Sequence, residues 1–126
     1  MRRKTALGVS VLLSVMTLVA LSPAAHADNG ACPANRFCLF EHDNYEGGRA
    51  VFHGTDRDLR NNFWSGGSRG PVHDGASSMI NNTGRRVVLF ANVGCSGRTY
   101  NAKRESSDRD LTNNGFDNKA DCVDFI

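Results

Sequence analysis

The apolar residues of this chain fall into short runs of alternating or continuous hydrophobic positions, separated by polar stretches rich in Gly, Asn and Asp. Val, Ile, Phe and Tyr dominate these runs, and none of them is long enough to make a convincing helix. The pattern predicts short β-strands at residues 37–41, 49–53, 77–81, 86–91, 98–101 and 122–126. The expected fold class is therefore all-β.

Two parts of the chain repeat one another. The sequence Asp56–Phe63 returns as Asp108–Phe116, with seven identical positions once one glycine is skipped. Upstream, Leu-Phe pairs ending at Phe40 and Phe90 hold nearly the same place in the two copies. Matches in register over about fifty residues indicate one structural unit built twice, and short strands in two units predict a β-sandwich of two tandem Greek keys. Each Asp-Arg-Asp-Leu stretch is expected to hold one short helical turn with its acids as caps.

The first 27 residues have the pattern of a secretory signal peptide: a basic start at residues 2–4, an apolar run at 7–21 and an Ala-x-Ala site at 25–27. We therefore expect a secreted mature chain of one domain, residues 28–126, with Greek key 1 at about 32–82 and Greek key 2 at about 84–126. Asn82-Thr83-Gly84 is a turn signal between the two units.

Charge limits the partners that the mature chain can have. Cleavage removes three of the 15 Lys and Arg residues and leaves 12 against 13 Asp and Glu, a net charge near −1. A strongly basic surface is therefore not expected, and neither nucleic acid nor, after cleavage, a membrane is an expected partner. We expect a monomer.

Four cysteines remain after cleavage. An even number in a small exported chain predicts two disulfides, and three pairings are possible. Loop entropy does not choose among them, but the repeat favours Cys32–Cys38, which closes a tight arch, and Cys95–Cys122, which lies within the second unit. Zinc is disfavoured because the spacing is not Cys-x₂-Cys.

The first unit contains a motif that resembles the signature of a known family. Phe40-Glu41, followed by Tyr45 and Gly47, resembles the signature hairpin of the βγ-crystallin Greek key, in which two aromatic residues meet and the glycine takes a positive φ. In the second unit Phe90 and Gly97 keep their places, whereas Ala91 replaces the acid and Cys95 the second aromatic residue. The resemblance covers nearly all of the mature chain, and it suggests that a Cys95–Cys122 disulfide took over the role of the lost aromatic corner.

The start of the mature chain resembles a narrower family. Cys32-Pro33 through Cys38, leading into Leu39-Phe40, is similar to the start of secreted actinobacterial peptidase inhibitors that have a crystallin fold and include a metalloproteinase inhibitor. This resemblance implies inhibition of an extracellular protease by a rigid surface loop that enters the protease cleft in an extended form.

The two units differ in length at one place, and this difference supplies the candidate inhibitory loop. Phe63 to Ala76 spans 13 residues, whereas Phe116 to Ala120 spans 4. An insertion on a duplicated scaffold is a common position for a binding function. The alternative is a flexible surface insertion with its tryptophan tucked onto the core. The candidate loop comprises Trp64, Ser65, Gly66, Gly67, Ser68, Arg69, Gly70, Pro71 and Val72.

The crystallin family closes each unit with a loop of the form Asn/Asp-Asn/Asp-x-x-Ser/Thr-Ser, which residues 73–78 and 117–122 match in part. In calcium-binding relatives the two loops share ligands, which implies Asp74, Ser77, Asp117 and Asp121 as a weak Ca²⁺ site. His73 and Cys122 depart from that pattern. The alternative is that the side chains of Ser77, Ser78 and Asp121 bond the backbone and hold the loops shut. No cofactor is required.

Nothing in the sequence points to catalysis. The remaining histidines fall in separate segments, no serine has a nucleophile-elbow pattern, and every cysteine is expected to be oxidised. We therefore expect a non-enzymatic secreted crystallin-type peptidase inhibitor. The competing hypotheses are a calcium-binding stability module and a cell-wall-binding or toxin-like module.

Overall fold

A computed structural model describes residues 30–126, so the signal peptide predicted at residues 1–27 lies outside the described part of the chain. Short strands and 3-10 turns alternate along the described residues. In order they are β1 Phe37–Phe40, η1 Asp43–Tyr45, β2 Arg49–Phe52, η2 Leu59–Asn61, β3 Ser78–Asn81, β4 Val87–Asn92, β5 Ser96–Ala102, β6 Ser106–Asp108, η3 Leu111–Asn114 and β7 Cys122–Phe125.

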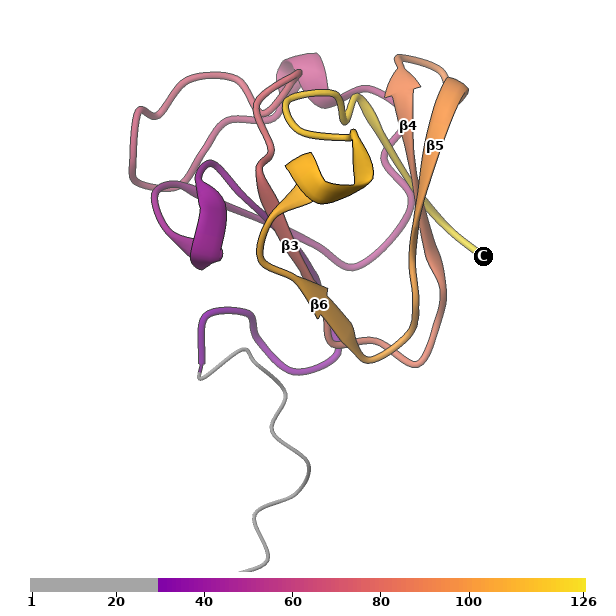
Figure 1. Ribbon diagram of the computed structural model, residues 1–126, viewed down its shortest axis with the longest axis horizontal. Helices are drawn as coiled ribbons and strands as arrows, with labels where there is room; N and C mark the ends of the chain where they lie inside the picture. The colour runs from indigo at the N-terminus through magenta and orange to yellow at the C-terminus, as the bar shows by residue number, and fades with distance from the viewer. Residues whose placement is uncertain (1–29) are drawn as a thin grey trace, which may run out of the picture.

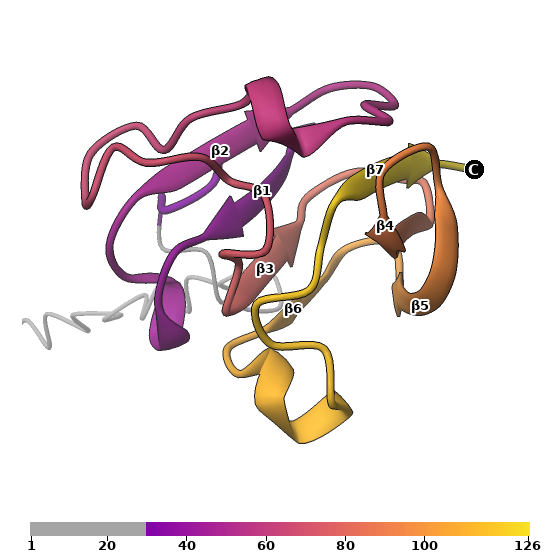
Figure 2. The ribbon, with the colours of Figure 1, turned by 90° about the horizontal axis from the view of Figure 1, so that it is seen from above.

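The strands form two antiparallel sheets, with strand orders β2-β1-β3-β6 and β5-β4-β7, which face each other as the two layers of a sandwich (Figures 1 and 2). Each of the predicted strands forms, with ends that differ from the expected bounds by at most two residues. The predicted all-β Greek-key sandwich is confirmed.

Each repeat gives one segment to the sheet of the other. Strand β6 leaves the second unit and pairs with β3, where Asp108 lies opposite Met79. In the first unit Asp56 leaves in the same way and pairs with Val123 of β7 through two 2.8 Å backbone hydrogen bonds. Strand β6 was not predicted because Ser106–Asp108 contains no apolar residue. The exchange joins the two Greek keys into one sandwich.

The repeated Asp-Arg-Asp-Leu stretches form short turns, as expected. Asp58 and Asp110 stand at the N-caps of η2 and η3, and each accepts a hydrogen bond from the backbone N–H two residues further on. A carboxylate in this position satisfies a donor that the first turn leaves free. The leucines that follow, Leu59 and Leu111, are fully buried between the sheets.

The main core lies between the two sheets and draws residues from both units. Its largest buried members are Phe37, Leu39, Phe52, Leu59, Trp64, Met79, Leu89, Leu111, Phe116 and Phe125. A second, smaller cluster of Cys32, Cys38, Phe40 and Ile80 holds Ala31 and Tyr45 against it.

The hairpin between β1 and β2 has the geometry expected from the crystallin resemblance. The rings of Phe40 and Tyr45 meet edge to face with their centroids 5.6 Å apart, and Gly47 has φ 77°. The hydroxyl of Ser78 accepts a hydrogen bond from the backbone N–H of Tyr45 and donates one to the carbonyl of His42. The folded hairpin is therefore fastened to β3.

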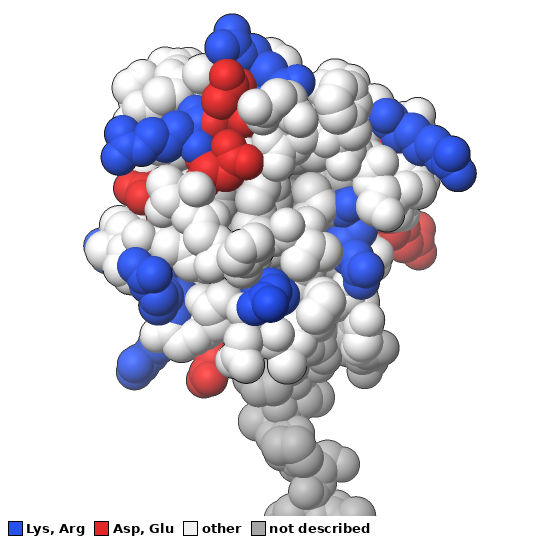
Figure 3. Space-filling view, turned by 180° about the vertical axis from the view of Figure 1, so that it is seen from behind, with Lys and Arg blue, Asp and Glu red and all other residues white. Residues whose placement is uncertain are grey.

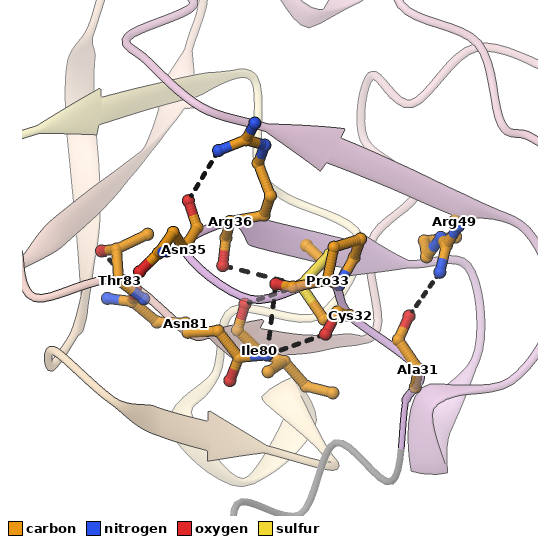
Figure 4. The surroundings of a disulfide bond; sticks show 11 residues. Ala31, Cys32, Pro33, Asn35, Arg36, Arg49, Ile80, Asn81 and Thr83 are labelled. Atoms are coloured by element: carbon orange, nitrogen blue, oxygen red, sulfur yellow. Dashed lines mark hydrogen bonds between the residues drawn. A yellow bond between two sulfur atoms is a disulfide. The ribbon is translucent and has the colours of Figure 1, made fainter.

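Both disulfides pair as the repeat favoured, Cys32 with Cys38 and Cys95 with Cys122. The first attaches the segment before β1 to that strand (Figure 4). The Nη1 of Arg49 donates a 2.7 Å hydrogen bond to the carbonyl of Ala31, which ties the same segment to β2.

Basic and acidic side chains are spread over the face shown in Figure 3 rather than gathered into one patch. Within residues 30–126, no helix has the length and hydrophobicity to cross a membrane.

Candidate functional site

The inserted segment of the first unit is a small hairpin at the edge of the first sheet. Phe63 lies opposite Pro71, with backbone hydrogen bonds from Trp64 N–H to the carbonyl of Gly70 and from Val72 N–H to the carbonyl of Asn62. Residues 62–72 are called the inserted hairpin below. It follows η2 and extends away from the body of the sandwich at the upper left of Figure 1.

The hairpin is joined to the sheet along one side. Ser65 and Arg49, the first residue of β2, exchange two backbone hydrogen bonds of 2.9 and 3.1 Å. Strand β2 is the edge of its sheet, so Ser65 continues the hydrogen-bonding ladder outward. In Figure 2 the segment after η2 runs alongside β2.

Trp64 anchors the hairpin in the main core. Its side chain is only 4% exposed and belongs to the main core, and Val72 at the other end of the hairpin is fully buried. Gly48 passes so close that a Cβ there would lie 2.5 Å from the Cβ of Trp64. Trp64 and Val72 are therefore anchors, and the part of the predicted loop that a partner can reach is Ser65–Pro71.

Comparison of the two units shows which aromatic residue of the first unit holds the core position. Skipping one glycine matches Phe63 to Phe116, but Phe116 is 1% exposed whereas Phe63 is 63% exposed. Counting from Asp56 and Asp108 without a gap matches Trp64 to Phe116, and these two residues are both buried. Trp64 thus takes the core position in the first unit, and the insertion begins after it.

Glu41 fastens the tip of the hairpin. Its carboxylate accepts hydrogen bonds from the hydroxyl of Ser68, from the backbone N–H of Ser68 at 3.0 Å and from the N–H of Gly48 at 3.4 Å. The Ser68 hydroxyl has the largest effect in lowering the pKa of Glu41 below its ordinary value, and burial partly offsets this. In the second unit Ala91 holds the corresponding place, and that unit has no insertion to fasten.

The tip of the hairpin is tightly turned rather than extended. Gly66, Gly67 and Arg69 all have φ between 58° and 82°. A side chain on Gly67 would overlap the Glu41 carboxylate and the backbone of Gly48, so only glycine fits there. The extended conformation expected of the inhibitory loop is therefore absent at these three residues.

The closing loops bring together some of the predicted calcium ligands but not all of them. Asp74 and Asp121 meet, since the N–H of Asp74 donates a 3.0 Å hydrogen bond to Oδ1 of Asp121, and His73 joins them. Asp117 is not a member of this cluster, and the backbone of Ser77 bonds to Phe40 and Leu111. In the sequence His73 is only a departure from the calcium pattern, and its place beside the two carboxylates depends on the fold.

The donor set of this cluster suits Ca²⁺ poorly. Nδ1 of His73 lies 2.5 Å from Oδ1 of Asp121, and Nε2 lies 3.3 Å from Oδ2 of Asp74, so the imidazole already stands between the two carboxylates. Calcium takes six to eight oxygen ligands and does not favour imidazole. Burial, with a further contribution from Asp74, raises the pKa of Asp121. The two loops are joined by the hydrogen bond from the N–H of Asp74 to Asp121, with the imidazole beside both carboxylates, and the backbone-bonding alternative agrees with the contacts of Ser78 and Asp121.

Comparison with known proteins identifies a family and a fold that this chain matches. The sequence profile of peptidase inhibitor family I36 matches residues 25–102, more than half of the chain. A search of curated proteins found no match.

Solved structures of similar fold are βγ-crystallin domains. One, from work on the evolution of the eye lens βγ-crystallin domain fold, has a TM-score of 0.65 at 21% identity and covers 75% of this chain and 89% of its own. A βγ-crystallin from Ciona intestinalis has a TM-score of 0.59 at 22% identity, covering 72% of this chain and 99% of its own. One from an archaeon has a TM-score of 0.59 at 17% identity, covering 75% and 100%. The chain therefore belongs to peptidase inhibitor family I36 and has the βγ-crystallin fold.

Proposed function

We propose that this protein is a secreted, non-enzymatic peptidase inhibitor that contacts its target through the inserted hairpin. The observation that carries the proposal is the way the hairpin is held. Trp64 anchors it in the core, Ser65 pairs with β2, and Glu41 accepts two hydrogen bonds from Ser68 at its tip. Membership of family I36 supports the class of target.

Rigidity is the property that separates an inhibitory loop from a tolerated insertion. A flexible loop loses conformational entropy when it binds, at a cost of about 0.5–1.5 kcal/mol for each immobilised side chain. In this hairpin the fold has already met much of that cost, because hydrogen bonds fix its base, one side and its tip. It has no disulfide of its own, and the contacts of Glu41 and Trp64 supply the restraint instead.

The experiment is an inhibition assay with the oxidised chain 28–126 against a panel of extracellular metallopeptidases and serine peptidases. The test variant replaces residues 65–71 with a two-residue turn and keeps both buried anchors, Trp64 and Val72, so that the core is preserved. The control replaces Thr112 in η3, an exposed residue of the second unit, with Ala.

We expect inhibition of at least one peptidase by the parent chain and by the control, and its loss in the shortened variant at an unchanged melting temperature. Full inhibition by the shortened variant would show that residues 65–71 do not contact the peptidase. A parent chain that inhibits no peptidase on the panel would refute inhibition itself.

A further inference from the structure

The extended part of the inserted hairpin is its first arm, and its side chains alternate as those of a strand do. Phe63 points outward at 63% exposure, Trp64 points inward at 4%, and Ser65 points outward again. None of these three residues has a positive φ, whereas the tip has three residues that do. The arm therefore offers one aromatic side chain on a backbone of extended form.

The backbone of Phe63 is also open. In an antiparallel pair flanked by the bonds from Trp64 to Gly70 and from Val72 to Asn62, the N–H and carbonyl of Phe63 point away from Pro71. They have no hydrogen-bond partner among residues 30–126. A strand edge with unpaired N–H and C=O groups is a template for pairing with another chain.

The arm itself carries no negative charge, although the hollow beside it is lined mostly by polar residues. Val51, Phe63 and Ile126 are the large hydrophobic residues exposed in the described part of the chain. Val51 lines an open hollow of about 270 Å³ with Asn62, the residue before Phe63, and the same hollow is lined by the polar side chains of His53, Thr55 and Asp56. From Leu59 to His73 the chain contains no Asp or Glu, and Arg60 and Arg69 are its cations.

We infer that Phe63 is the principal anchor of this inhibitor, and that its targets are peptidases whose specificity pocket is apolar and large enough for a phenyl ring. This inference rests on the proposed function and moves the contact from the tip of the hairpin to its first arm. Phe63 fills the pocket while its N–H and carbonyl pair with the extended edge of the cleft. A Phe that is 63% exposed contributes little to the stability of the free protein, and burial in a partner removes that surface from water.

Position 69 provides the contrasting test. Arg69 is exposed at the tip and would fit an acidic pocket, but its backbone is left-handed and not that of a bound peptide strand. The two residues therefore predict opposite specificities. Anchoring by Phe63 predicts inhibition of peptidases that cleave beside aromatic or large aliphatic residues, and anchoring by Arg69 predicts inhibition of those that cleave beside Arg or Lys.

The experiment compares inhibition constants of the oxidised chain 28–126 with those of Phe63→Ala, Phe63→Leu and Arg69→Ala on every peptidase that the parent chain inhibits. Truncating an anchor typically weakens binding by about 30-fold or more. We expect that loss for Phe63→Ala, partial recovery for Phe63→Leu, and less than about a fivefold change for Arg69→Ala. Circular dichroism melts will test whether each variant folds. We expect the Phe63 variants to fold, because the side chain of Phe63 is exposed.

A second measurement reads the backbone directly. In the free protein the amide of Phe63 should exchange with solvent faster than that of Trp64, and it should become protected in the complex. Equal inhibition by Phe63→Ala, or loss confined to Arg69→Ala, would overturn the inference while leaving inhibition by the hairpin intact. Absence of inhibition by the parent chain would instead remove the proposed function on which the inference rests.

Discussion

Two adjacent aromatic residues, Phe63 and Trp64, should respond in opposite ways to truncation. Trp64→Ala removes a side chain that is 4% exposed and lies in the main core beneath the hairpin. Truncation of a buried Phe or Trp to Ala typically costs about 3–5 kcal/mol. In a domain of about this size, 3 kcal/mol lowers the melting temperature by roughly 12 °C or more. Phe63→Ala removes an exposed ring, and we expect a change within about 0.5 kcal/mol.

The second unit supplies a matched control. Phe116 is 1% exposed and occupies the place of Trp64, so Phe116→Ala should destabilise the protein about as strongly as Trp64→Ala. Trp64→Phe, which installs the residue of the second unit, should cost less than half as much as Trp64→Ala. This variant keeps the test informative if Trp64→Ala does not fold.

The assay is a thermal melt of the oxidised chain, followed by circular dichroism and by calorimetry. The reasoning would be refuted if Phe63→Ala lowered the melting temperature as much as Trp64→Ala, because Phe63 would then be the core residue. The same result would also refute the assignment of Phe63 as an exposed residue and therefore as the anchor.

Three further predictions follow from the contacts of the site and of the capped turns. Glu41→Gln keeps one acceptor but loses the charge, and a hydrogen bond to a charged group contributes about 1 kcal/mol more than one to a neutral group. The amide of Ser68 should therefore exchange about fivefold faster, and unchanged exchange would show that Glu41 does not hold the tip. Millimolar Ca²⁺ should leave the melting temperature of the parent chain almost unchanged. It should raise that of His73→Asn by several degrees, because the imidazole no longer stands between the carboxylates. An equal rise in both proteins would contradict the role given to His73. The hydrogen bonds from Arg60 lower the pKa of Asp58 from 3.8 to about 2, so its charge stabilises the fold above about pH 4 and this contribution disappears as the pH falls towards 2. Asp58→Asn retains the cap, and its deficit in melting temperature should be much smaller at about pH 2 than at about pH 6. A deficit of the same size at both pH values would point to the cap rather than the charge.

Much of the architecture could be predicted from local sequence. Short alternating or continuous runs of apolar residues, rich in Val, Ile, Phe and Tyr, located β1 to β5 and β7. The repeat indicated two similar units and the pairing of the cysteines, and the Asp-Arg-Asp-Leu stretches form capped turns because that chemistry acts within three residues.

What the sequence left open depends on contacts between residues far apart in the chain. Ser106–Asp108 becomes β6 only because β3 offers an edge to pair with, and no local pattern marks it. Glu41 meets Ser68 across 27 residues, and Asp74 meets Asp121 across 47.

The choice between Phe63 and Trp64 shows the limit most clearly. Two adjacent residues on an extended arm point to opposite sides, so one of two large aromatic side chains must be exposed. Their order in the sequence does not say which, because both are apolar enough for a core. Pairing of Ser65 with β2 and the close approach of Gly48 set the register of the arm and turn Trp64 inward. The sequence by itself thus determined that an aromatic pair stands where the two units begin to differ in length, and the tertiary structure decided which ring is left for a partner.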